Sequence, residues 1–244
     1  MSFSVIIPAR FEAQRLPGKP LLDIGGKPMV QHTWERANES SAQLVAVATD
    51  DERIAEVVDG FGGQVVMTGK AHRSGTDRLQ EAATTLGLAD DAIVVNLQAD
   101  EPMLPAQAIE QVAANLASHP QMGIATLCET IEAKDEIDDP NAVKVVVGEA
   151  GQALYFSRAT IPYKASASAR NCYRHIGLYA YRVEVLNQFV QWPPAELELA
   201  EKLEQLRALS HGIAIHVARS DARIPAGVDT EKDLEAARRY LAAS

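Results

Sequence analysis

The first half of the chain alternates short apolar runs with segments of helical spacing, and this order limits the folds open to it. The apolar runs predict strands at residues 3–8, 44–48, 64–67 and 92–97. The segments between them predict helices at 28–39, 51–60 and 76–86. An alternating order of this kind implies a mostly parallel sheet with helices on both faces, which is an α/β fold.

The second half has a different texture. A helix from Pro105 to about Ala117 and a strand near 122–131 come first. From about residue 138 strands dominate, and the segment 138–195 is expected to be a smaller β-rich lobe that covers the sheet edge. The rest of this half is predicted to be a strand at 213–217 and helices at 196–211 and 233–241, the first burying Leu199, Leu203, Leu206 and Leu209 on one face.

Length and charge restrict the class of protein. The 244 residues suffice for one large α/β domain that includes the lobe. The net charge of −10 argues against a general nucleic-acid or membrane-surface binder, which needs a basic face. The two cysteines have no metal-ligand spacing, and no signal peptide or membrane span is apparent. We therefore expect a cytoplasmic protein with reduced thiols.

Cations cluster directly after the first strand. Arg10 follows the strand, and Arg15 and Lys19 flank Gly18 in a proline-rich loop. Ligands of open α/β sheets bind at the carboxyl ends of strands, and guanidinium and ammonium groups suit phosphate oxygens. The loop matches neither the Walker phosphate loop nor the Gly-x-Gly-x-x-Gly fingerprint. It predicts polyphosphate binding of another kind, although an ordinary loop with surface cations would look similar.

Two aspartates are candidates for a metal site. Asp100 follows the most apolar strand, at 92–97, and Asp229 follows a turn that contains proline and glycine. Carboxylates from two separate loops suit Mg²⁺ that bridges phosphate groups. Each also has a structural explanation, because Asp100 could cap a turn and Asp229 could begin the last helix.

Four further segments carry side chains suited to binding. The segment 72–78 contains Arg73, Ser74 and Arg78, and it could read a nucleobase or simply cap a helix. Residues of the second half would suit a carboxylated, polyhydroxylated substrate: Arg158, His175, Tyr179, Glu204 and Gln205. A solvated helix face is the simpler explanation of Glu204 and Gln205.

Taken together and in this order, the motifs resemble the 3-deoxy-manno-octulosonate (Kdo) cytidylyltransferase family, also called CMP-Kdo synthetases. The resemblance covers essentially the whole chain. It is carried by Arg10 with 15–20, and by 72–76, 98–102, 140–144, 155–158, 175–179, 203–207 and 228–230.

The resemblance implies a Rossmann-like nucleotide-diphospho-sugar transferase fold and a homodimer that depends on Mg²⁺. It implies that CTP and Kdo react to give CMP-Kdo and diphosphate, for lipopolysaccharide biosynthesis. Lys19, Arg15, Asp100 and Asp229 would carry the catalysis, the two aspartates as metal ligands. The nucleotide would be held by Arg10, Lys19, Arg73, Ser74, Arg78 and Gln98. The sugar would be held by Arg15, Gln98, Arg158, His175, Tyr179, Glu204 and Gln205.

Two positions depart from the family pattern. Ala99 stands where glycine is usual, so its methyl group is a strain if φ is positive there, or a clash if the nucleotide passes close by. Glu12 stands where small hydroxyl residues are common, and it would repel a triphosphate if it pointed inward.

Other functions remain open from the sequence. The sugar acid could be the 8-amino analogue of Kdo or a sialic-type acid. A hexose-1-phosphate nucleotidylyltransferase would need a more cationic sugar site and no carboxylate pocket. A nucleotide-binding regulator without catalysis would not require the combination of Lys19, Asp100 and Asp229.

Overall fold

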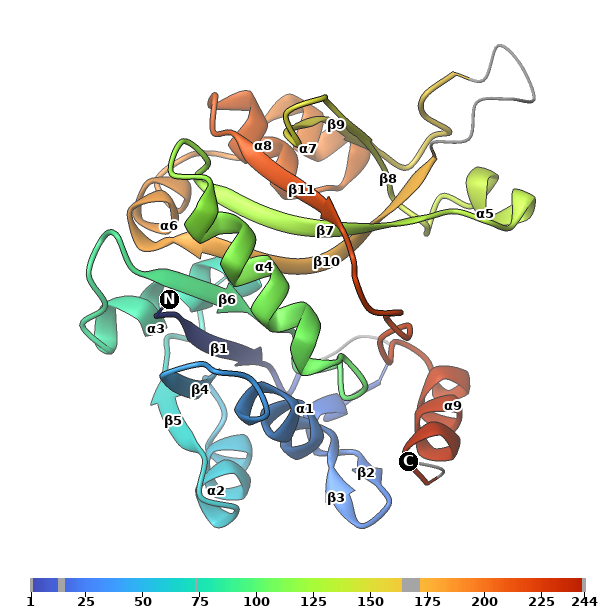
Figure 1. The fold of residues 1–244 in the computed structure, drawn as a ribbon. Helices are drawn as coiled ribbons and strands as arrows, with labels where there is room; N and C mark the ends of the chain where they lie inside the picture. Colours follow the sequence, from blue (N-terminus) through green and yellow to red (C-terminus); the bar gives the residue numbers. More distant parts are fainter. Residues whose placement is uncertain (1, 13–15, 73, 164–171, 243–244) are drawn as a thin grey trace.

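The computed structural model describes residues 2–12, 16–72, 74–163 and 172–242. A nine-stranded mixed sheet runs through these residues (Figure 1). Its main path has the order β11 (Ile215–Arg219), β7 (Ile124–Thr130), β10 (Tyr173–Arg182), β6 (Ile93–Asn96), β1 (Ser4–Ala9), β4 (Leu44–Thr49) and β5 (Gln64–Met67). The strands β6, β1, β4 and β5 are parallel to their neighbours within this group, and so are β11 and β7. The predicted α/β fold with a mostly parallel sheet is therefore confirmed.

The long strand β10 departs from the expected arrangement. It lies inside the sheet, antiparallel to both β6 and β7, and does not cover an edge. Only β8 (Lys144–Val147) and β9 (Ala153–Ser157) extend the sheet sideways from it. Leu178 and Ala180 of β10 are buried, which is the burial expected of an interior strand. Sequence pattern alone does not give the order of strands, so this insertion was not foreseen.

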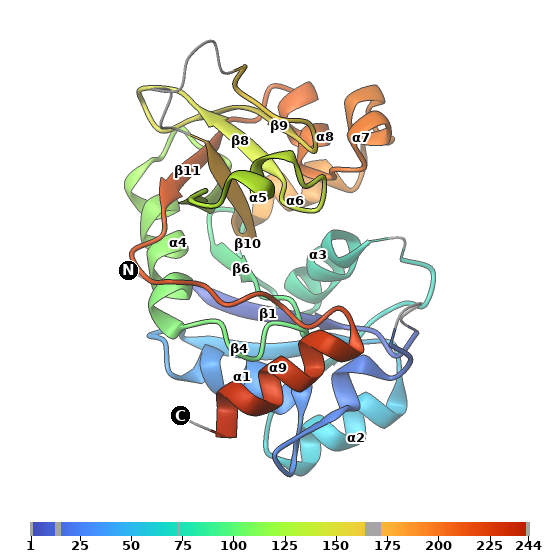
Figure 2. The same ribbon diagram turned by 90° about the vertical axis from the view of Figure 1, so that its right-hand side faces the viewer.

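Helices cover both faces of the sheet (Figures 1 and 2). One hydrophobic cluster contains residues of α1 (Met29–Asn38), α2 (Glu52–Gly60) and α4 (Ala106–Ser118). A second cluster contains residues of α3 (Gly75–Thr85), α6 (Val183–Phe189) and α8 (Gln205–Ser210). Because side chains alternate along a strand, Ile6 belongs to the second cluster and its neighbours Val5 and Ile7 belong to the first.

The helix expected at 196–211 is two short helices. The helix α7 (Glu196–Glu201) ends at Lys202, whose φ of 54° is left-handed, and α8 begins at Gln205. Leu203 and Leu206 are buried as expected, but Leu199 is 64% exposed. The expectation of one continuous leucine face was therefore wrong. The break places Glu204 at the start of α8, where its side chain can leave the helix surface.

The last helix returns to the beginning of the chain. The helix α9 (Glu231–Ala242) packs on the hairpin of β2 (Asp23–Ile24) and β3 (Lys27–Pro28). Its Leu234 and Ala237 share a buried cluster with Ile24, Met29 and Val228 (Figure 2). This packing brings the segment before α9 against the loop after β1. A short 3₁₀ helix (Lys19–Leu21) ends that loop, and α5 (Lys134–Asp138) lies beyond β7. None of the helices in the described ranges has the length and apolar character that a membrane crossing requires.

We expect the strand β1 to be the most sensitive part of the core. Replacing the fully buried Ile7 by alanine should lower the free energy of unfolding by about 2–5 kcal/mol, because it leaves a cavity under α1 and α4. Urea unfolding measures this. Leu199→Ala is the control, since its exposed side chain should change stability by about 0.5 kcal/mol or less. Equal losses in the two variants would contradict this account of the core.

Candidate active site

Three distant segments of the chain meet at one ammonium group. The Nζ atom of Lys19 lies 2.5 Å from Oδ2 of Asp100 and 2.9 Å from Oδ1 of Asp229. The side chain of Lys19 is only 12% exposed. Burial disfavours its charge, but the two carboxylates outweigh burial, so the pKa of Lys19 lies above its ordinary value. The pairing of Asp100 with Asp229 expected from the sequence is thus present in the fold.

The loop that carries Lys19 is shaped by Gly18. This residue has φ of +67°, and a Cβ atom there would lie 3.2 Å from the ring of Phe11. Both conditions favour glycine. The amide of Gly18 donates to the carbonyl of Phe11 at 2.9 Å, and the guanidinium of Arg53 covers the outer face of the ring. The loop is therefore closed before Lys19 begins the short 3₁₀ helix.

A pocket of about 190 Å³ lies beside this ion pair, at the carboxyl ends of β1 and β6. It is lined by Pro8, Arg10, Glu12, Lys19, Pro20, Gly75, Gln98, Ala99 and Asp100. Burial and the neighbouring Arg78 lower the pKa of Arg10, although Asp50, Asp77 and Glu204 oppose them. An incoming anion would stabilise the positive charge of Arg10, because Arg10 is partly buried and lies close to the cation Arg78. Arg10 is therefore suited to bind phosphate.

A second pocket of about 360 Å³ shares Asp100 with the first and also contains Asp229 and His175. Glu101 lines it as well. Burial raises the pKa of Glu101 to about 8, and the charges of Asp100 and Asp229 act in the same direction. At neutral pH this carboxyl group is mainly protonated, so it adds little negative charge to the site.

The segment before α3 forms a capped helix start. Oγ of Ser74 accepts from the amide of Asp77 at 3.1 Å, and the Asp77 carboxylate accepts from the amide of Ser74 at 3.1 Å. This is a capping box, as one interpretation of the sequence expected. It leaves Gly75 facing the pocket, with Gln98 and Pro8 beside it.

Arg78 lies beneath this helix start. It is fully buried, its Nη2 atom lies 3.0 Å from Oδ2 of Asp50, and its Nη1 atom donates to the hydroxyl of Thr68. Asp50 follows β4 and Thr68 follows β5, so Arg78 ties α3 to the ends of two strands. In this conformation its guanidinium supports the pocket without lining it.

One hydrogen bond joins α3 to the second half of the chain. Oγ1 of Thr76 donates to Oε2 of Glu204 at 2.5 Å. Thr76 is buried, and the adjacent phenol of Tyr181 is buried too. Glu204 therefore lies close to the helix start expected to hold the nucleotide. The Gln205 side chain makes no hydrogen bond or ion pair with another described residue, although Gln205 begins α8.

A bulge in β10 brings His175 and Tyr179 together. The register shifts between Ile176 and Tyr179, and the rings of His175 and Tyr179 have centroids 5.2 Å apart. Oγ1 of Thr126 lies 3.0 Å from Nε2 of His175 and 2.8 Å from the carbonyl of Leu178. Burial lowers the pKa of His175 to about 3 and raises that of Tyr179 well above its ordinary value. Both side chains are thus neutral at physiological pH.

Arg158 has a different setting. Its backbone amide donates to Oε2 of Glu201, and its side chain donates to the carbonyls of Glu201 and Pro140 at 2.9 Å. These bonds fasten the end of β9 to the end of α7. In this conformation Arg158 lines neither of the two pockets. Arg15 and Arg73 lie outside the described residues.

The two departures from the family pattern have distinct settings. Among the described residues other than glycine, only Lys202 has a positive φ, so Ala99 is not strained. Its carbonyl accepts from Thr33 at 3.1 Å, and it lines the pocket beside Lys19. Of the two effects expected for the Ala99 methyl group, strain and a clash with the nucleotide, only the clash is left. Glu12 is exposed at the pocket, where its charge opposes an anion.

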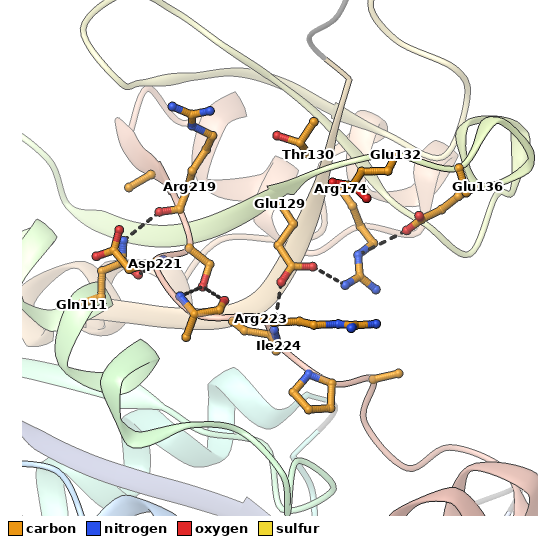
Figure 3. Close-up of a pocket in the computed structure, with 16 residues that line it drawn as sticks. Gln111, Glu129, Thr130, Glu132, Glu136, Arg174, Arg219, Asp221, Arg223 and Ile224 are labelled. Carbon is orange, nitrogen blue, oxygen red and sulfur yellow. Dashed lines mark hydrogen bonds and ion pairs between the residues drawn. The ribbon is translucent and has the colours of Figure 1, made fainter.

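Sequence reasoning did not foresee several contacts that shape the site. Thr76, Glu129 and Arg174 form contacts between segments that are far apart in the chain, and no local motif marks such pairs. A cleft of about 1280 Å³, larger than either pocket, borders the 220–226 segment (Figure 3). It contains Glu129, which belonged to no candidate set, and Arg174, whose segment 173–179 was expected to suit the substrate.

Comparison with known proteins places this chain in a family. A model of cytidylyltransferases matches residues 4–215. A 3-deoxy-manno-octulosonate cytidylyltransferase of Hahella chejuensis is 58% identical, over 100% of this chain and 99% of that protein. The chain belongs to the 3-deoxy-manno-octulosonate cytidylyltransferase family. A cytidylyltransferase of the same name from Cellvibrio japonicus is 53% identical, over 99% of this chain and 98% of its own.

Solved structures agree with this assignment. The structure of a CMP:2-keto-3-deoxy-manno-octonic acid synthetase in complex with CTP has a TM-score of 0.94 and 45% identity, covering 99% of this cytidylyltransferase and 98% of that chain. A 4-diphosphocytidyl-2C-methyl-D-erythritol synthase has a TM-score of 0.67 at 16% identity, which shows a shared fold alone. The predicted family, fold and enzyme class are confirmed.

The carboxylates of the cytidylyltransferase form an incomplete donor set for a metal. Asp100 and Asp229 each have an oxygen within 3 Å of one cationic atom, the Nζ of Lys19. The described residues contain no group of three or more histidine, cysteine or acidic side chains arranged for a metal. Mg²⁺ is commonly held by one or two carboxylates with substrate phosphates and water. The residues present therefore fit a magnesium ion that arrives with a nucleotide.

We expect the stability of the cytidylyltransferase to depend on pH through His175. The unfolded histidine binds a proton below about pH 6.5, but the folded one does so only near pH 3. Stability is therefore lost as pH falls between these values. The advantage of the wild type over His175→Asn should shrink by about 1–2 kcal/mol between pH 7.5 and pH 5. Urea unfolding at both pH values measures it, and an unchanged difference would contradict the low pKa.

Proposed function

We propose that this chain transfers the cytidylyl group of CTP to Kdo, giving CMP-Kdo and diphosphate. The observation that carries the proposal is the meeting of Lys19, Asp100 and Asp229 beside a pocket that also contains Arg10 and Gln98. The names of the relatives, which span the full chain at more than 50% identity, support the choice of sugar and nucleotide. The 8-amino analogue of Kdo is the alternative acceptor.

Positioning and charge neutralisation would account for most of the catalysis. The anomeric hydroxyl of the sugar acid attacks the α-phosphorus in line, forming a new P–O bond as the bond to diphosphate breaks. Arg10 and Lys19 hold the triphosphate, with Arg15 near the reacting phosphate. Asp100 and Asp229 would hold Mg²⁺, which would neutralise phosphate charge and favour loss of the sugar hydroxyl proton to a carboxylate or to water. His175 is neutral and is not needed as a base.

The two pockets that share Asp100 suggest how the substrates divide the site. The nucleotide takes the pocket with Gly75, Gln98 and Arg10, supported by Arg78, and the segment of Arg73 and Ser74 reads the base. The sugar lies toward His175, Tyr179, Glu204 and Gln205. The hydrogen bond from Thr76 to Glu204 joins the two parts. Arg158 would reach the sugar only by leaving its present carbonyl partners.

The family resemblance is also the basis for three broader proposals. The chain is proposed to work as a homodimer in the cytoplasm, with the lobe at 138–195 contributing to the sugar site and the dimer contact. Its product is proposed to serve lipopolysaccharide biosynthesis. Light scattering in solution tests the dimer directly, and a monomer at micromolar concentration would contradict it.

The proposed reaction is tested by diphosphate release with CTP, Mg²⁺ and Kdo. The 8-amino analogue, sialic acid and UTP are the comparison substrates. We expect release with Kdo and CTP, and little with the others. Release only with another sugar acid would keep the cytidylyl transfer and change the acceptor. No release with any acceptor would contradict the proposed function.

The metal role of Asp100 is tested by its amide variant. Asp100→Asn should lower turnover by about 10²–10³-fold and change CTP binding much less, because the carboxylate acts on charge that develops during transfer. The matched control is Glu12→Gln, which removes the same charge from the same pocket. That variant should bind CTP at least as well as the wild type. Near-normal turnover of Asp100→Asn would rule out the metal role.

A further inference from the structure

The position of Asp229 depends on the segment 220–229, which we call the strap. It connects β11 to Asp229 and belongs to no helix or strand. At its start the amide of Ser220 donates to the carbonyl of Cys128 at 2.9 Å, and near its end the amide of Val228 donates to the carbonyl of Asp100 at 2.9 Å. Between these points the strap borders the large cleft (Figure 3).

One side chain holds the middle of the strap. Oε1 of Glu129, at the end of β7, accepts from the amide of Ile224 at 2.9 Å. Within 222–227, no other backbone amide of the strap donates to a side chain outside it, as far as the described residues go. The isolated bond is therefore well placed to set the path of the strap.

Glu129 is itself oriented by a cation. Nη2 of Arg174 donates to its Oε2 atom at 2.6 Å, and Nε of Arg174 lies 3.4 Å from Glu136 (Figure 3). The side chains of Glu129 and Arg174 are only 22% and 30% exposed. The Coulomb attraction within an ion pair that is partly shielded from water is stronger than that of a fully exposed pair. Each carboxylate oxygen of Glu129 thus has one fixed partner.

Because Ile224 and Asp229 are only five residues apart, fixing the Ile224 backbone also restricts the position of Asp229. The side chain of Ile224 is buried in the main core, and Val228 is fully buried beside α9. Between them a Cβ atom on Gly227 would lie 2.7 Å from Oε1 of Glu101, so the strap passes close to the Glu101 side chain there. The strap is fixed at both ends of the five-residue step that leads to Asp229.

We propose that Glu129 is a positioning residue for Asp229, acting through the backbone of Ile224, with Arg174 orienting the Glu129 carboxylate. The proposal rests on the proposed function, because it assigns Asp229 to the metal and phosphate site. Glu129 touches no substrate in this account. Its effect is to hold the Asp229 carboxylate next to Lys19 and Asp100, where the two aspartates can bind a divalent metal ion together.

The test compares Glu129→Ala and Glu129→Gln with two control variants. Glu132→Ala removes a carboxylate that lines the same cleft. This carboxylate makes no hydrogen bond or ion pair with a described residue. Gln111→Ala releases a different side-chain anchor, at the start of the strap, where the Gln111 amide group bonds the backbone of Arg219 and Asp221. Glutamine at position 129 keeps an acceptor for the Ile224 amide and loses the ion pair. Thermal unfolding checks that each variant is folded.

Two readouts separate positioning from a general loss of structure. The first is hydrogen exchange of peptides that cover 222–230, and the second is the affinity for Mn²⁺ in the presence of CTP, measured by electron paramagnetic resonance. Glu129→Ala should speed exchange severalfold and weaken Mn²⁺ binding by about tenfold or more, as loss of a residue that orients a metal ligand does. Glu129→Gln should have an exchange rate and an Mn²⁺ affinity close to those of the wild type. The Mg²⁺ concentration for half-maximal diphosphate release should rise in parallel, with the KM for CTP at saturating Mg²⁺ nearly unchanged.

The outcomes distinguish this proposal from the proposed function. If Glu129→Ala behaves as Glu132→Ala in both exchange and Mn²⁺ affinity, Glu129 does not position Asp229. If Gln111→Ala has the same effect as Glu129→Ala, the anchor at Ile224 has no special role and the proposal is also overturned. A wild type that releases no diphosphate with any sugar acid contradicts the proposed function alone, because exchange and Mn²⁺ affinity still decide the role of Glu129.

Discussion

The contact of one ammonium group with two carboxylates organises this molecule. Lys19, Asp100 and Asp229 come from the beginning, middle and end of the chain, and they meet within hydrogen-bonding distance. Lys19 loses most of its hydration there, which would be unfavourable without the two opposite charges. The raised pKa of Lys19 shows that attraction outweighs burial. The three segments are therefore held together by a charge arrangement that is also the one a phosphate and a divalent cation require.

The sheet explains how residues so far apart can meet. Parallel pairing of β1 with β6 brings the loops after both strands to the same edge, which places Lys19 near Asp100. Asp229 arrives from the opposite end of the sheet, since β11 is an edge strand. The strap and the packing of α9 on the β2–β3 hairpin then bring it to this point. The contacts of Lys19 with Asp100 and Asp229 thus depend on the pairing of β1 with β6 and on the packing of α9 against the β2–β3 hairpin.

Much of the fold and part of the site could be predicted from the sequence, for identifiable reasons. The strands β1, β4, β5 and β6 are apolar runs with clear boundaries, and the charged residues that follow β1 and β6 mark a ligand edge. The position of β10 could not be predicted, because pairing partners are set by tertiary packing. The break at Lys202 was also hidden, since leucine spacing continues through it. Contacts such as that of Thr76 with Glu204 join residues over one hundred positions apart and leave no local pattern.

The charges around the ion pair give a physical reason to favour a metal-dependent reaction. Asp100 and Asp229 exceed Lys19 by one negative charge, and Glu12 adds another at the pocket. Glu101 contributes little, because burial raises its pKa to about 8. Arg10 offsets only part of this charge, so a triphosphate would meet a site with no excess of positive charge among the described residues. A divalent cation that enters with the nucleotide would balance the excess negative charge and free Lys19 to bind phosphate. Asp100 and Asp229, which would otherwise repel the triphosphate, would then bind it through the cation.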